Sequence, residues 1–124
     1  MFYNEATFRG EVSKGSCFYI DADTNRGWPH QSDTTLCKFG VTSKDPSVRC
    51  RENEEALHRR WHIAEAELEV VFVATGQITA AEKEIADHTL PWLPEGFQKN
   101  AEWRHCSPRG LARIATLIAE DRHR

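Results

Sequence analysis

Four side chains spread along the chain are of types that suit phosphate chemistry: Tyr19, Lys38, Arg49 and Glu82. Hydrolysis of a phosphodiester needs an activated water, a cation to balance the charge that grows on the phosphate oxygens, and help for the leaving oxygen. A guanidinium can hold a phosphate through two parallel hydrogen bonds, and a carboxylate can hold a divalent metal. These residues can act together only if the elements that carry them bring them to one place.

Two short strands are predicted to carry the tyrosine and the lysine. Residues 17–20 are rich in aromatic and branched side chains, and residues 36–41 form a second apolar run that ends in a glycine and a polar turn. An antiparallel hairpin of these strands would bring Tyr19 near Lys38. Tyr19 could equally be a half-buried strand aromatic, and Lys38 an outward lysine on an edge strand.

A helix is predicted from Pro46 to about His62, because Asp45 is a preferred N-cap and proline fits the first helical position. Arg49 would lie on its first turns, within reach of the strand ends. Taken alone, Arg49 is an ordinary surface charge. The polar run at residues 51–55, which includes Arg51 and Asn53, is predicted to be a solvated face.

Glu82 falls on a second helix, predicted from about Gln77 to Thr89, after a buried strand within residues 67–75. The glutamate also has a structural interpretation. The run from Thr79 to Glu82 matches a capping box, in which the glutamate would bond the backbone N–H of the cap residue.

The remaining elements complete a small α+β fold. A final strand is predicted within residues 100–106, and Ser107 and Pro108 precede a third helix. The order of elements predicts a central, mostly antiparallel sheet of three to four strands flanked by about three helices. Residues 21–35 are predicted to be a long loop, in which Trp28 either folds back on the body or contacts a ligand.

One domain is the natural interpretation of 124 residues, with a core over about residues 15–120 and an N-terminal arm or edge strand over residues 1–14. No apolar run is long enough for a membrane span, which predicts a cytoplasmic protein without membrane contact. The four cysteines include no CxxC pair and are expected to be reduced, mostly buried thiols. A net charge of −3 argues against a general nucleic-acid coat but leaves room for a local basic groove.

The order of these residues resembles the GIY-YIG nucleases, in particular the small branch with a Lys-Ile-Gly-like second motif. Residues 17–19, Cys-Phe-Tyr, stand where the family has Gly-Ile-Tyr, and residues 38–40, Lys-Phe-Gly, stand for the second motif. Arg49 occupies the arginine place on the first helix, Ala81-Glu82 the glutamate helix, and Glu102-Trp103 the closing strand. The resemblance spans roughly residues 17–118. It departs from the family at Cys17 and Lys38, and at Asn53, where some members carry a histidine.

The resemblance implies a metal-dependent endonuclease or nicking enzyme that hydrolyses double-stranded DNA, with Tyr19, Lys38, Arg49 and Glu82 as catalytic residues and Glu82 as the ligand of Mg²⁺ or Mn²⁺. On this view Lys38 lowers the pKa of Tyr19, which accepts the proton of the water or orients it. A lone domain of this size offers few base-reading elements, so low specificity or a homodimer is expected. Residues expected to support the catalytic side chains or to contact the substrate are Trp28, Gly40, Thr42, Arg51, Asn53, Asn100 and Glu102.

The alternative is a catalytically silent module with the same fold that binds nucleic acid or a protein partner, as an inhibitor or accessory protein would. The negative net charge and the absence of an added DNA-reading domain favour that alternative. Glu102 also keeps two interpretations, a partner of the metal site or a plain acid at a strand end.

Overall fold

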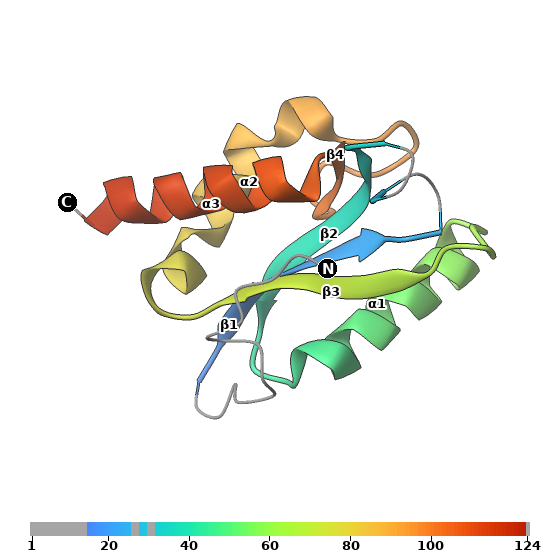
Figure 1. Cartoon of the computed structure of the whole chain (residues 1–124), viewed down its shortest axis with the longest axis horizontal. Helices are drawn as coiled ribbons and strands as arrows, with labels where there is room; N and C mark the ends of the chain where they lie inside the picture. The colour runs from blue at the N-terminus through green and yellow to red at the C-terminus, as the bar shows by residue number, and fades with distance from the viewer. Residues whose placement is uncertain (1–14, 26–27, 30–31, 124) are drawn as a thin grey trace.

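The computed structural model describes residues 15–25, 28–29 and 32–123, so the predicted arm at residues 1–14 lies outside the described part. It has a four-stranded antiparallel sheet in the order β3-β1-β2-β4 (Figure 1). The strands are β1 (Cys17–Asp23), β2 (Thr35–Thr42), β3 (Leu68–Ala74) and β4 (Trp103–Cys106). The α-helices are α1 (Pro46–Arg60), α2 (Glu82–His88) and α3 (Pro108–His123), and the short 3₁₀ helices are η1 (Gly76–Ala81) and η2 (Leu90–Trp92). The predicted α+β fold class is confirmed.

Helices cover both faces of the sheet. Helix α1 lies on one face, while η1 and α3 pack on the other, with α2 beside them (Figure 1). Successive side chains of a strand point to opposite faces. On β1, Phe18 and Ile20 therefore enter the core under α3, and Cys17 enters a smaller core under α1.

The first strand continues three residues beyond its predicted end, to Asp23, so the predicted loop is shorter than expected. Both aspartates of this extension are fully buried, and both have polar partners. Asp23 accepts hydrogen bonds from the backbone N–H groups of Asn25 and Glu67, at 2.9 and 3.2 Å. The low strand propensity of aspartate is thus overridden by tertiary contacts.

Helix α1 begins as predicted. Asp45 is its N-cap and accepts a hydrogen bond from the backbone N–H of Ser47 at 2.8 Å, and Pro46 occupies the first turn. The buried stripe contains Cys50, Asn53 and Leu57. The prediction that Asn53 belongs to a solvated face is therefore wrong, whereas Arg51 is exposed as predicted.

The second predicted helix is interrupted. Residues 76–81 form η1, and α2 begins only at Glu82. The Thr79 hydroxyl donates to the backbone carbonyl of Gly76 at 2.8 Å, and no side chain caps α2. The prediction of a capping box is therefore wrong, and Glu82 has no capping role in this helix.

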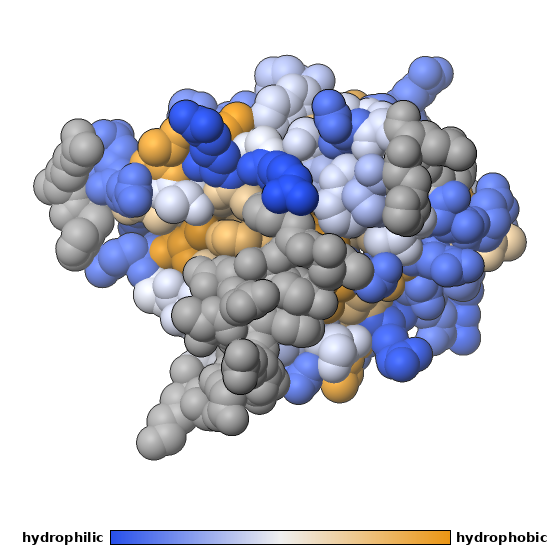
Figure 2. Space-filling view, viewed as in Figure 1, coloured by the Kyte–Doolittle hydropathy of each residue, from blue (hydrophilic) through white to orange (hydrophobic). Residues whose placement is uncertain are grey.

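All four cysteines are buried and free, as expected from the sequence. Among the described residues, none of the helices combines the length and the apolar character that a bilayer crossing needs. The surface seen in Figure 2 is mainly polar, with an apolar area beside α3. A shallow groove there is lined by Phe72, Ala74, Ile78 and Ala119.

Candidate functional site

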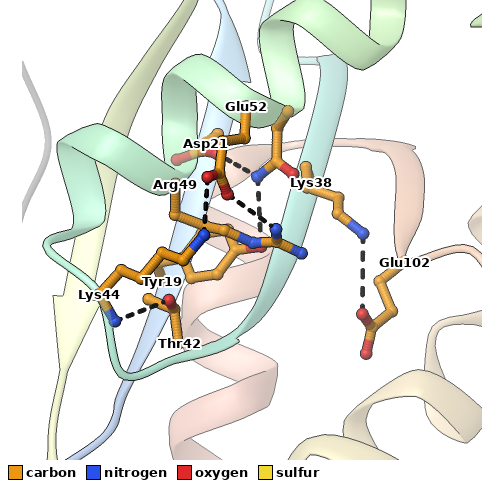
Figure 3. A network of polar contacts seen from close by, with 9 residues as sticks. Tyr19, Asp21, Lys38, Thr42, Lys44, Arg49, Glu52 and Glu102 are labelled. Carbon is orange, nitrogen blue, oxygen red and sulfur yellow. Dashed lines mark hydrogen bonds and ion pairs between the residues drawn. The ribbon is translucent and has the colours of Figure 1, made fainter.

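The strand register gathers polar side chains on the face of the sheet that α1 covers. Tyr19 on β1 lies opposite Gly40 on β2, and Asp21 lies opposite Lys38. Arg49 extends toward these residues from α1 (Figure 3), and Asn53 of the same helix hydrogen-bonds to Tyr19 and Asp21. Residues far apart in the sequence therefore meet on one face because the strand side chains alternate with a period of two.

A buried hydrogen-bond network surrounds the Tyr19 hydroxyl. The Asn53 amide nitrogen Nδ2 donates to the Tyr19 hydroxyl at 3.2 Å and to Asp21 Oδ2 at 2.9 Å. The Arg49 guanidinium also hydrogen-bonds to this hydroxyl. Tyr19 is only 1% exposed, so Arg49 and Asn53 separate it from solvent. A ligand would meet the guanidinium before it met the phenol.

The electrostatics of Tyr19 differ from the sequence expectation. Burial raises its pKa to about 12, although the hydrogen bonds from Asn53 and Arg49 oppose this rise. Lys38 extends away from the phenol, toward Glu102 (Figure 3). The prediction that Lys38 lowers the pKa of Tyr19 is therefore wrong, and the phenol is neutral at physiological pH.

A second set of contacts joins Lys38 to Glu102 and, through Glu102, to Glu82. Lys38 Nζ lies 3.7 Å from Glu102 Oε1 and 5.6 Å from the centre of the Trp103 ring. Glu102, which directly precedes β4, also hydrogen-bonds to Glu82 at the first turn of α2. Burial and the contact with Glu82 raise the pKa of Glu102 to about 7, against the opposing effect of Lys38. Two carboxyl groups thus meet, and the one on Glu102 lies beside the Lys38 ammonium group.

Asp21 is a member of the site that the sequence analysis missed, because it was assigned to a loop. It is fully buried, and its Oδ1 atom has no hydrogen-bond partner among the described residues. Burial raises its pKa to about 7, while Asn53, Cys50, Lys38 and Arg49 all oppose the rise. The alternation of Cys17, Tyr19 and Asp21 could have revealed that it shares a face with the tyrosine.

A pocket of about 360 Å³ opens above these contacts, between α1 and the segment at residues 98–101. Lys38 and Arg49 both line it, which brings the two networks to one cavity. Its lining also includes Asn53, Arg60, Asn100 and Trp103.

Two of the remaining predicted site residues have structural explanations at the edge of the network. A Cβ atom on Gly40 would lie 2.8 Å from the Tyr19 hydroxyl, so glycine leaves room for the ring. Thr42 accepts a hydrogen bond from the backbone N–H of Lys44 at 3.0 Å and so shapes the turn before α1.

The other two predicted residues lie apart from the pocket. Trp28 is buried in the core on the α3 side of the sheet, which confirms that it folds back on the body. Arg51 lines a separate cavity with Ser47 and Leu68. Neither belongs to the constellation around Lys38 and Arg49.

The oxygen-only pair of Glu82 and Glu102 suits a hard cation. Magnesium is commonly held by one or two carboxylates, with water and substrate phosphate completing the coordination. The described residues include no cluster of three or more His, Cys, Asp or Glu side chains placed to hold a metal ion. The donor type therefore fits Mg²⁺ or Mn²⁺, provided that water and substrate supply most of the ligands.

No protein-family model, curated protein or solved structure matches this chain. The class that the fold and the site define is a small α+β domain in which Lys38 and Arg49 line one pocket and Lys38 pairs with Glu102, which in turn contacts Glu82. A fold alone does not specify a function, so the functional evidence lies in these side chains.

Proposed function

We propose that this protein is a metal-dependent endonuclease of the GIY-YIG type, which hydrolyses or nicks the phosphodiester backbone of DNA. The observation that carries the proposal is the contact between Glu82 and Glu102, together with the ion pair from Glu102 to Lys38, which lines a pocket with Arg49. Residues from β2, α1, α2 and the segment before β4 supply these groups. Two acids and two bases in that arrangement match a site that holds a cation and a phosphate together.

Each residue has a definite task in the proposed reaction. Arg49 binds the phosphate through its planar donor fork, and Lys38 adds a second positive charge beside it. Glu82 and Glu102 would hold a divalent ion, which supplies Lewis-acid stabilisation of the phosphate oxygens when bound. Tyr19 is neutral and buried, so it acts by accepting a hydrogen bond from Arg49 and orienting that guanidinium.

Plasmid cleavage tests the proposal. With Mg²⁺ or Mn²⁺, the wild type should convert supercoiled DNA to nicked or linear forms, and Glu82→Gln and Arg49→Ala should each reduce the rate by about 100-fold or more. Glu84→Gln is the matched control, since Glu84 lies on the same helix but pairs with Arg122 at 2.9 Å. Thermal unfolding of each variant verifies that it is folded.

The proposal fails if cleavage is equal in the wild type, Glu82→Gln and Arg49→Ala, because a contaminating nuclease would then explain it. A wild type that produces no cleavage on supercoiled, linear or gapped DNA with either metal also contradicts it.

One observation favours the second candidate, a catalytically silent module that binds nucleic acid or a protein partner. Tyr19 is 1% exposed, so this phenol cannot touch a substrate in the described conformation. Such a module would retain DNA without metal and give no product. A module that binds a protein instead would leave DNA unretained at low salt and recover one polypeptide in a pull-down.

A further inference from the structure

The pocket beside Lys38 and Arg49 has a polar wall that the proposed cleavage chemistry does not use. This wall comprises Arg60 near the end of α1, together with Gln98 and Asn100 from the segment before β4. At about 360 Å³ the cavity lies at the lower end of the range for small-molecule sites. A whole duplex cannot enter such a space, but a single nucleotide unit is of the right order.

The charges around the pocket favour an anion. Lys38, Arg49 and Arg60 line it, against Glu52 as the acid of the lining. Glu52 is already engaged, because it accepts from Arg49 at 3.1 Å and from Lys44 at 2.7 Å. The Arg60 side chain has no ion pair or hydrogen bond to any described residue, so its guanidinium is available to a phosphate.

The remaining wall can recognise a planar polar group. Gln98 and Asn100 are exposed, and their side-chain amides make no hydrogen bond to the described part of the chain. Carboxamides donate and accept at once, which matches the edge of a nucleobase. Trp61 closes this side and is stacked on Phe97, with ring centres 4.8 Å apart and planes 17° apart. Aromatic rings of this kind support unpaired bases in single-stranded nucleic-acid sites.

We propose that this pocket binds one unpaired nucleotide of a DNA strand, with its phosphate on Arg60 and Arg49 and its base against Gln98, Asn100 and Trp61. The inference deepens the proposed function, on which it rests, by naming the substrate class. A base inside a duplex is stacked and paired and cannot reach such a wall. The preferred substrate is therefore DNA with an unpaired nucleotide beside the cleaved bond, such as a gap, a flap or a single-stranded end.

Calorimetric titration without metal tests the pocket separately from cleavage. The probes are deoxynucleoside 5′-monophosphates, deoxyribose 5-phosphate and inorganic phosphate. At least one nucleotide should bind about tenfold more tightly than deoxyribose 5-phosphate, since only the nucleotide contacts the amides. Asn100→Ala should remove this difference. Arg60→Ala should weaken nucleotide and sugar phosphate alike, by about tenfold.

The neighbouring arginine provides the control. Arg59 does not line this pocket and pairs with Glu55 at 2.8 Å, so Arg59→Ala changes the net charge equally but should leave nucleotide binding unchanged. If Arg59→Ala and Arg60→Ala weakened nucleotide binding equally, the loss would be explained by the change in net charge, and the inference would be overturned. Equal affinity for nucleotide and sugar phosphate, or no binding of any probe, would also overturn it. Plasmid cleavage that survives such a result would leave the proposed nuclease intact, whereas nucleotide binding without cleavage would remove only the catalytic proposal.

Discussion

The two faces of the sheet each bury an ionisable side chain, but they differ in how completely that side chain is hydrogen-bonded. Under α2 and α3, the fully buried Arg104 donates to the Thr89 hydroxyl at 2.9 Å and to the backbone carbonyls of Ala86, Ala101 and Trp103 at 3.1, 2.9 and 2.7 Å. Under α1, the equally buried Asp21 has an amide donor at 2.9 Å and a hydrogen bond with the Cys50 thiol, and its Oδ1 atom has no partner among the described residues.

This contrast separates a structural charge from a candidate functional one. A buried ion that is fully hydrogen-bonded holds segments together, and Arg104 joins β4 to the end of α2 in this way. A buried acid with a free oxygen costs stability, and such costs concentrate at functional sites. The polar residues under α1 are therefore the better candidates for chemistry, although both faces are made from the same strands.

The largest effect on stability should come from removing the fully hydrogen-bonded Arg104 side chain. Replacement Arg104→Met leaves the carbonyls of Ala86 and Ala101 without their donors and should lower the free energy of unfolding by about 3 kcal/mol or more. Urea denaturation measures this loss. Arg113→Met, at an exposed position on α3, is the control and should change the free energy by less than about 0.5 kcal/mol. Equal effects of the two variants would contradict the structural role of Arg104.

Replacing Asp21 on the other face should have a smaller effect of opposite sign, namely an increase in the free energy of unfolding. The pKa of Asp21 is raised in the folded protein to about 7, so the folded state keeps a proton that the unfolded chain releases. Stability is then lost as the pH rises from about 4 to 7, and the loss is complete above that range. Asp21→Asn abolishes this titration, and its advantage over the wild type should be larger at pH 8 than at pH 5 by on the order of 2 kcal/mol.

Urea denaturation at the two pH values provides the measurement for Asp21→Asn. Glu102, whose pKa is also raised to about 7, still titrates in both proteins, so its contribution cancels in the difference. An advantage that is the same at pH 5 and pH 8 would show that Asp21 is not an uncompensated buried acid.

The smallest effect concerns the space around the phenol. Gly40→Ala places a methyl group 2.8 Å from the Tyr19 hydroxyl and 3.2 Å from two ring carbons, so the ring must shift. The free energy of unfolding should fall by about 1 kcal/mol, and plasmid cleavage should fall with it because Arg49 loses its support. Gly110→Ala on α3 is the control, because its added carbon would meet Ser107 at an ordinary 3.5 Å. Unfolding in urea and the cleavage assay together detect the change, and a neutral Gly40→Ala would contradict the tight packing of this ring.

Much of the fold was predictable because its signals are local. The two strands of the hairpin, the Asp45 cap and the third helix that begins at Pro108 follow from alternation and helix-start signals. The η1 helix was not predictable in this way, since residues 76–81 have the same apolar spacing as an α-helix and differ only in hydrogen bonding. The split also removed the capping box that Thr79 and Glu82 suggested.

The site was predictable only in part, for a physical reason. Lys38, Arg49 and Glu82 were predicted from residue type and order. Lys38 and Glu82 are linked through Glu102, and Lys38 shares a pocket with Arg49, which depends on the sheet register. Asp21 was missed, because aspartate inside a strand is unfavourable unless a distant donor compensates it. That donor, Asn53, lies 32 residues away and was itself assigned to a solvated face.

The Asn53 amide has one more consequence, which concerns the direction of a hydrogen-bond relay. An ionised Asp21 can only accept, so it turns the NH₂ end of the amide toward itself and toward the Tyr19 oxygen at the same time. The phenol oxygen then receives hydrogens from Asn53 and Arg49, so its own hydrogen must point away from both donors. The buried Asp21 carboxylate thus sets the orientation of the Asn53 amide and, through it, the direction of the hydrogen bond to Tyr19. If Asp21 gained a proton, it could donate to the amide oxygen, and the Asn53 amide could rotate and reverse these hydrogen bonds.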